Sequence, residues 1–162
     1  MYDWPISRQV VWGIRIPVWY NALENPEIQV EFLDKAGARV TAKVVDALKA
    51  HTFEQIESGL QRMSAPINAI FKISREKPGE NFLQETDTFD TWFSSGQWPL
   101  VTLGYPESAD FKYFYPTSVL ETGWEILRFW VSRMIMFGLY RTGRVPFETV
   151  YLHGLVRALD GR

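Results

Sequence analysis

The chain has no cysteine and only two histidines, His51 and His153, among its 162 residues. The absence of thiols excludes disulfides and thiolate metal ligands, and two histidines so far apart in sequence argue against a histidine-based zinc site. No apolar run approaches the ~18 residues of a membrane span. The N-terminus lacks the basic-then-apolar pattern of a signal peptide. We therefore expect a cytoplasmic protein that binds no zinc and contacts no membrane.

A surplus of basic charge is also missing. Lysine and arginine number 17 against 19 acidic residues, for a net charge of −2, so no overall positive field attracts nucleic acid. Arg8 and Arg15 are candidates for contact with an RNA end, although solvated surface arginines are the more common case. Apolar residues, in contrast, are abundant, at 46% hydrophobic and 15% aromatic. This composition argues against disorder and suffices for a core.

Residues 21–85 have charged, alternating segments that differ from the apolar stretches on both sides. The alternation in Ile28–Leu33 and Arg39–Val44, around a turn at Asp34–Gly37, predicts a hairpin with one exposed face. A further strand is expected within Asn68–Ser74. These patterns predict a small α+β module inserted into another domain.

A helix is expected within the same module. Thr52 and Gln55 have the spacing of a capping box, in which each side chain bonds to the other residue's backbone N–H. Ile56, Leu60 and Met63 follow at helical spacing. The pattern therefore predicts a helix that begins after Thr52 and continues past Leu60.

The last third of the chain has a strand–helix–strand pattern. Ser118–Thr122 is a short β-branched strand, residues 125–140 form a helix that is apolar on most sides, and Thr149–Leu152 is a second strand. A helix of this kind is expected to be buried between a sheet and another element. The order predicts a right-handed βαβ unit with two parallel strands.

Two tryptophan-bearing stretches point to a small-molecule site near this unit. Trp92 lies in an expected turn at 92–96, and Trp130 lies in the apolar helix. Glu125 follows Gly123 at the carboxyl end of the first strand, where open α/β sheets bind ligands. A carboxylate there suits a ribose hydroxyl, but it also suits a helix start, which the helix dipole favours. Both tryptophans also fit an ordinary core.

Five stretches of the sequence occur in the order of one enzyme family. They are Ile6–Tyr20, Asp90–Ser95, Phe114–Leu120, Trp130–Met134 and Leu152–Val156. Together they resemble the catalytic core of the class I aminoacyl-tRNA synthetases, most closely the valyl group. The resemblance implies an α/β fold in which residues 1–20 and 86–162 form the second half of a Rossmann-like nucleotide-binding core. Residues 21–85 would be a cysteine-free inserted α+β module.

The resemblance also implies roles for single residues. Trp92 and Trp130 would be the walls of the pocket for the valine side chain. The residues at the ATP or adenylate site would be Gly123, Glu125, His153 and Gly154. The family needs no protein nucleophile, so no catalytic residue is expected in this segment. The implied substrates are valine, tRNA(Val) and ATP, with Mg²⁺ accompanying ATP.

The chain departs from the family pattern at several points. Ile14 stands where the family usually has histidine, and Glu125 where it usually has aspartate. The two signature ATP motifs, His-Ile-Gly-His-like and Lys-Met-Ser-Lys-Ser, are absent. We therefore expect a fragment that is inactive alone and whose partners include the remaining synthetase domains. An isoleucyl-type fragment and a non-catalytic interaction module on the same scaffold remain open alternatives.

Overall fold

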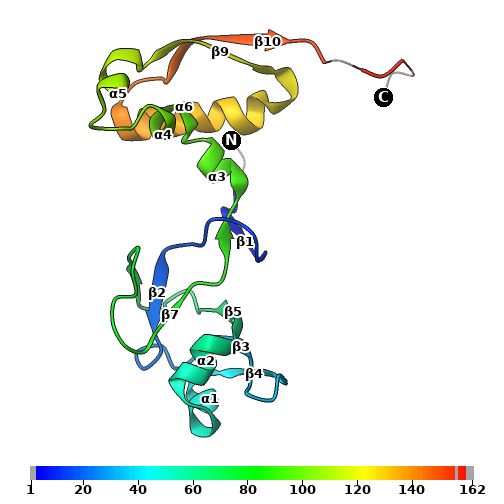
Figure 1. Ribbon diagram of the computed structural model, residues 1–162, viewed down its shortest axis with the longest axis vertical. Coiled ribbons are helices and arrows are strands. Elements are labelled where there is room, and N and C mark those ends of the chain that lie inside the picture. Colours follow the sequence, from blue (N-terminus) through cyan, green and yellow to red (C-terminus); the bar gives the residue numbers. More distant parts are fainter. Residues whose placement is uncertain (1–2, 156, 160–162) are drawn as a thin grey trace. The chain divides into compact units, whose positions relative to one another are not determined.

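The computed structural model describes residues 3–155 and 157–159, and the chain divides into two compact units between Phe89 and Asp90 (Figure 1). Each unit combines helices with small sheets, so the expected α/β class is confirmed at this level. Residues 18–21 pair with strands of the first unit. None of the helices in the described part is long and apolar enough to cross a membrane.

In its described residues, the first unit holds two three-stranded antiparallel sheets, a short two-stranded pairing and two helices. Its elements are β1 (Ser7–Arg8), β2 (Val18–Asn21), β3 (Gln29–Leu33), β4 (Arg39–Lys43), α1 (Val44–Ala50), α2 (Phe53–Gly59), β5 (Leu60–Ser64), β6 (Phe71–Ile73), β7 (Phe82–Gln84) and β8 (Thr88–Phe89). The sheets have the orders β4-β3-β5, β6-β2-β7 and β1-β8. The strand expected within residues 68–74 is therefore confirmed as β6.

The predicted hairpin is confirmed. Gln29 lies opposite Lys43 and Leu33 opposite Arg39 across β3 and β4. Successive side chains of a strand point to opposite faces, and accordingly Val30 and Phe32 are buried while Gln29 and Leu33 are exposed. Val30 and Phe32 belong to the core of this unit, which α1 and α2 complete through Val44, Ala47 and Ile56.

The capping box of α2 is confirmed, but the predicted length of the helix is wrong. Thr52 and Gln55 bond reciprocally, yet α2 ends at Gly59 and the next residues form β5, which pairs with β3. Leu60 lies opposite Phe32 and Met63 opposite Val30, with an irregular register between them. The extra residue of this β-bulge turns Leu60 and Met63 toward the same core. A bulged strand thus produced the three-residue spacing of a helix.

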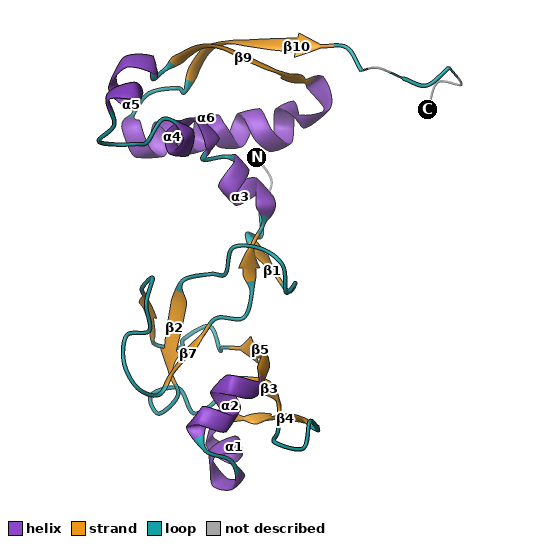
Figure 2. Ribbon diagram, viewed as in Figure 1, coloured by secondary structure: helices purple, strands orange, loops and turns teal. Residues whose placement is uncertain are grey.

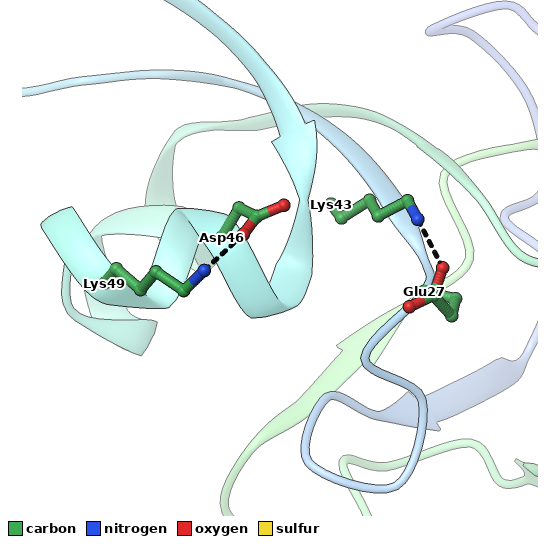
Figure 3. A network of polar contacts seen from close by, with 4 residues as sticks. All are labelled: Glu27, Lys43, Asp46 and Lys49. Atoms are coloured by element: carbon green, nitrogen blue, oxygen red, sulfur yellow. Dashed lines mark hydrogen bonds and ion pairs between the residues drawn. The ribbon is translucent and has the colours of Figure 1, made fainter.

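Helix α1 was not predicted from the sequence. No side chain caps its N-terminus, and it is too short to show a clear helical period. Figure 3 shows two ion pairs beside it, Lys43 with Glu27 at 2.5 Å and Asp46 with Lys49 at 2.6 Å.

These pairs shift two pKa values in opposite directions. The hydrogen bond from Lys49 lowers the pKa of Asp46, and the bond to Glu27 raises that of Lys43. The Asp46 contribution to stability is therefore present above its unfolded pKa and lost as pH falls through its folded pKa. The Lys43 contribution is present below its unfolded pKa and lost as pH rises through its folded pKa. Both pairs are solvent-exposed, so each contribution is small.

The second unit packs helices on one side of two parallel strands (Figure 2). Its elements are α3 (Thr91–Ser95), α4 (Trp98–Thr102), α5 (Ala109–Phe114), β9 (Thr117–Gly123), the 3₁₀ turn η1 (Trp124–Ile126), the π turn η2 (Leu127–Val131), α6 (Ser132–Thr142) and β10 (Phe147–His153). The predicted strand–helix–strand order and the parallel pairing of β9 with β10 are confirmed. Leu120, Val131, Met134 and Phe147 form the core between the strands and the helix.

Two predictions for this unit need correction. The turn expected at residues 92–96 is helix α3 with Gly96 at its end. The helix expected at 125–140 begins with a 3₁₀ turn and a π turn and becomes α-helical only at Ser132. One side of it is buried, whereas Phe129 and Tyr140 are exposed. Because apolar residues occur on several sides of this segment, its sequence indicated neither the change of helix type nor the exposed side of the helix.

Candidate functional site

The carboxyl ends of the two parallel strands lie next to each other in the second unit. His153, the last residue of β10, pairs with Gly123, the last residue of β9. Glu125 follows in the first turn after β9, and Gly154 follows His153 directly. All four residues that the sequence assigned to ATP therefore lie at one end of the strand pair, where open α/β sheets bind ligands.

The Glu125 carboxylate folds back over Gly123. In this conformation a Cβ atom at residue 123 would overlap both carboxylate oxygens, so a larger residue there would displace the end of the flexible Glu125 side chain. Glu125 is exposed, and among the described residues no protein donor bonds to its carboxylate. Both oxygens are thus available as acceptors for hydroxyl groups of a ligand.

His153 is a weaker candidate than its position suggests. Its ring Nδ1 lies 2.9 Å from the carbonyl oxygen of Gly154. A Cβ atom at residue 154 would meet no atom within 4 Å, and both residues are exposed. The backbone here is therefore open to a flat group such as a purine, but within the described residues no side chain encloses one.

The two tryptophan-bearing stretches are brought together. The Trp92 ring stacks on Phe129 at 5.9 Å between centroids, with an interplanar angle of 24°. The Trp130 indole donates a hydrogen bond from Nε1 to the Ser95 carbonyl oxygen at 2.9 Å. Both contacts join α3 to the π turn. One indole is thus held by stacking and the other by a hydrogen bond, and we refer to the two together as the aromatic surface.

The two indoles are not in ring contact with one another. Trp130 instead meets Trp98, edge-on, at 6.0 Å between centroids. Trp92 and Trp130 are both half-buried, so each keeps a face that a ligand can reach. That these faces line one cleft stays a prediction.

Gly96 allows α3 to approach α6 closely. A Cβ atom at residue 96 would lie 2.8 Å from Phe137 Cδ2 and 3.0 Å from Arg133 Cβ. Phe137 also meets Phe93 edge-on at 5.3 Å. The contact between the two helices therefore depends on the missing side chain of Gly96.

Replacing Gly96 by alanine should destabilise the second unit by about 1–3 kcal/mol, because a methyl group forced into a closed contact displaces its neighbours. Thermal or urea unfolding of the purified chain measures the loss. Gly154→Ala is the matched control, since residue 154 has open space around it, and its effect should stay below about 0.5 kcal/mol. Equal stability of the two variants would contradict the close approach.

A separate hollow of about 660 Å³ lies in the first unit, and arginines line it. The Arg15 guanidinium donates to the carbonyl oxygens of Glu85 and Gln84 at 2.8 and 3.3 Å. Arg39 pairs with Glu31, and Arg62 donates to the Gln9 side chain. An anion entering this hollow would compete with acceptors of the protein itself, so the hollow is a weaker candidate than the strand ends.

Arg8, the other arginine considered for RNA, donates to the carbonyl oxygens of Pro5 and Ser7. Among the described residues, no group of three or more His, Cys, Asp or Glu side chains is arranged to hold a metal ion.

Sequence reasoning missed several residues that build the aromatic surface. Phe129 and Trp98 hold the two indoles, and Ser132 and Arg133 bond to carbonyl oxygens of the π turn. The aromatic residues beside Trp130 in sequence were a signal for Phe129, whereas Trp98 lies in another stretch of the chain. Ser132 and Arg133 fall within the stretch Trp130–Met134 that resembles the synthetase family, but no sequence pattern marked the π turn to which they bond.

Comparison with known proteins places the whole chain within one family. The family model described as tRNA synthetases class I (I, L, M and V) matches residues 1–162. The chain is 41%, 40% and 43% identical to the valine--tRNA ligases of Schizosaccharomyces pombe, Coxiella burnetii and Symbiobacterium thermophilum, each over 99% of its length. A chloroplastic/mitochondrial valine--tRNA ligase of Arabidopsis thaliana is 42% identical. The chain spans about 14% of the length of these relatives.

Proposed function

Since the chain belongs to the class I tRNA synthetases (I, L, M and V), we propose that it is the segment of a valine--tRNA ligase that forms the valine side-chain pocket and part of the ATP site. The observation that carries this proposal is an identity of 40–43% with valine--tRNA ligases over nearly the whole chain. The full-length protein would charge tRNA(Val) with valine at the expense of ATP, in the cytoplasm. Its ATP would carry Mg²⁺, held outside this segment.

The proposed reaction needs positioning rather than a protein nucleophile. The valine carboxylate attacks the α-phosphorus of ATP, an oxygen–phosphorus bond forms, and pyrophosphate leaves. Such a step is accelerated when the two reactants are held in line and the developing charge is stabilised. The segment's contribution is to hold the two ends of the adenylate, its amino-acid side chain and its nucleoside.

The strand ends would take the nucleoside. An exposed carboxylate on Glu125 can accept hydrogen bonds from ribose hydroxyls, and Gly123 leaves the space that positions this carboxylate. The backbone at His153 and Gly154, adjacent to Gly123 across the strand pair, would lie against the adenine. This end of the strand pair belongs to the Rossmann-like half-core that we propose for residues 1–20 and 86–162, with 21–85 as its insertion.

The aromatic surface would take the valine side chain. A rigid indole wall limits the depth of an apolar pocket, so isoleucine, with one more methylene, fits poorly. Threonine has nearly the shape of valine, and an apolar pocket rejects it only weakly, a rule for which valyl-tRNA synthetases are themselves the usual illustration. Selection against threonine would therefore need residues outside this segment.

Amino-acid-dependent exchange of pyrophosphate into ATP by the full-length protein tests the proposal. We expect exchange with valine and at least about tenfold less with isoleucine, as one methylene in an apolar pocket allows. Exchange with isoleucine but not with valine would assign the segment to the isoleucyl type. No exchange with any amino acid would favour an interaction module.

The 162-residue chain alone should give no exchange with valine, because it spans about 14% of the length of its relatives and offers a pocket without the groups that stabilise the reacting phosphates. The same assay measures this, with the full-length protein as the positive control. Exchange by the isolated chain at even one hundredth of the full-length rate, about 2.7 kcal/mol of barrier, would contradict the division of roles.

A further inference from the structure

The helix that carries Trp130 is widened by one residue just where the indole projects. The backbone N–H of Ser132 donates to the carbonyl oxygen of Leu127, five residues earlier. In an α-helix it would donate to Arg128, four residues earlier. π turns of this kind are rare and are frequently found at functional sites.

Two side chains that follow the turn form hydrogen bonds to it. The Ser132 hydroxyl donates to the Arg128 carbonyl oxygen at 2.5 Å. The Arg133 guanidinium donates through Nη1 to the Phe129 carbonyl oxygen at 2.6 Å and to that of Arg128 at 3.4 Å. The same guanidinium lies over the Phe129 ring, 5.8 Å from its centroid. Ser132 and Arg133 therefore bond to carbonyl oxygens of the widened turn.

The turn controls where the aromatic surface lies. Phe129 and Trp130 both belong to it, and they contact Trp92 and the Ser95 carbonyl. If the turn relaxed to an α-helix, the part before it would rotate by about 100° relative to α6, the angle of one helical residue. Trp130 would then lose its bond to Ser95, and Glu125 would also shift.

We propose that Arg133 and Ser132 are positioning residues that hold the π turn Leu127–Val131 and thereby fix Trp130 in the pocket for the amino-acid side chain. The role of Trp130 in an amino-acid pocket rests on the function proposed above, whereas the stabilisation of the turn by Ser132 and Arg133 does not. Neither residue touches the proposed ligand. Their effect is transmitted through the backbone carbonyls of Arg128 and Phe129.

The test uses the full-length protein with three variants, Arg133→Met, Ser132→Ala and Arg133→Lys. Arg133→Met keeps the length of the side chain but removes its donors, and Arg133→Lys restores one donor. Arg141→Met is the matched control, because Arg141 lies on the same helix and contacts Tyr105 at 5.4 Å rather than the turn.

Hydrogen exchange measured by mass spectrometry reports directly on the stability of the backbone hydrogen bonds in the turn. In Arg133→Met and Ser132→Ala, the backbone amides of residues 127–133 should exchange at least about tenfold faster, and those of 139–142 should be unchanged. In the pyrophosphate exchange assay, the KM for valine should rise about tenfold for Arg133→Met, while kcat should change less than about threefold, since a mispositioned indole weakens binding of the valine side chain. Arg133→Lys should recover most of the loss.

The outcomes separate the two proposals. Unchanged hydrogen exchange at residues 127–133 in both Arg133→Met and Ser132→Ala would overturn the positioning role, whatever the pyrophosphate exchange activity of these variants. Faster exchange in these two variants but not in Arg141→Met would support it, even if the wild-type protein activated an amino acid other than valine. If Arg133→Met did not fold, Ser132→Ala and Arg133→Lys would decide by the same measurement.

Discussion

In the full-length protein, Trp130→Ala is expected to lower kcat/KM for valine in pyrophosphate exchange by about a hundredfold. Truncation to alanine of a tryptophan that anchors a binding site costs about 2 kcal/mol or more of binding free energy. A loss of about 2.7 kcal/mol corresponds to about a hundredfold in kcat/KM. The variant removes the wall that the valine side chain would contact and the hydrogen bond that joins the π turn to α3.

The matched variant is Trp130→Phe, which keeps an aromatic, though smaller, wall and removes the Nε1 donor. Its loss should be about fivefold, the equivalent of one neutral hydrogen bond. Melting temperatures of both variants, measured beside the activities, separate a lost pocket from a lost fold. A Trp130→Ala protein that remains folded and has wild-type kcat/KM for valine would exclude Trp130 from the pocket.

Phe32→Ala is expected to destabilise the first unit by about 3–5 kcal/mol, the usual cost of removing a fully buried phenylalanine ring. Phe32 is 0% exposed, lies on the central strand β3, and meets the His51 ring edge-on at 5.1 Å. Strands β4 and β5 both pair with this strand. A cavity at this position therefore affects the whole sheet.

Phe71→Ala provides the comparison, because Phe71 is 56% exposed and lies on the edge strand β6. Its effect should stay below about 1 kcal/mol. The midpoint of urea unfolding, with an unchanged slope, measures both losses. Similar midpoints for the two variants would show that the first unit does not depend on the core described here.

The sequence was a reliable guide where local chemistry decides the structure. The alternation of Ile28–Leu33 and the capping box at Thr52 each depend on neighbouring residues, and each corresponds to an observed element. The parallel pairing of β9 with β10 followed from the order of elements alone.

It was a poor guide where a distant contact decides. Gly59, the last residue of α2, packs against the backbone of Leu33, where a Cβ atom would overlap the Leu33 carbonyl oxygen. The bulge that follows is set by pairing with β3. Likewise, the π turn before α6 depends on side chains that bond back to it. The spacing of apolar residues in the sequence does not reveal the one extra residue in this turn.

The candidate site, too, could be predicted from the sequence only in part. The position of Gly123, Glu125, His153 and Gly154 at one end of two strands was predictable, because parallel strands bring their carboxyl ends together. The contacts of Trp92 with Phe129 and of Trp130 with Ser95 were not, because they join segments about 35 residues apart in sequence through a short helix that was expected to be a turn.

The most direct test of the account is a crystal structure of the full-length protein with a non-hydrolysable analogue of valyl-adenylate. The account predicts that the isopropyl group lies in van der Waals contact with the Trp92 and Trp130 indoles, while a ribose hydroxyl donates to the Glu125 carboxylate. An analogue bound with its isopropyl group away from both indoles would contradict it.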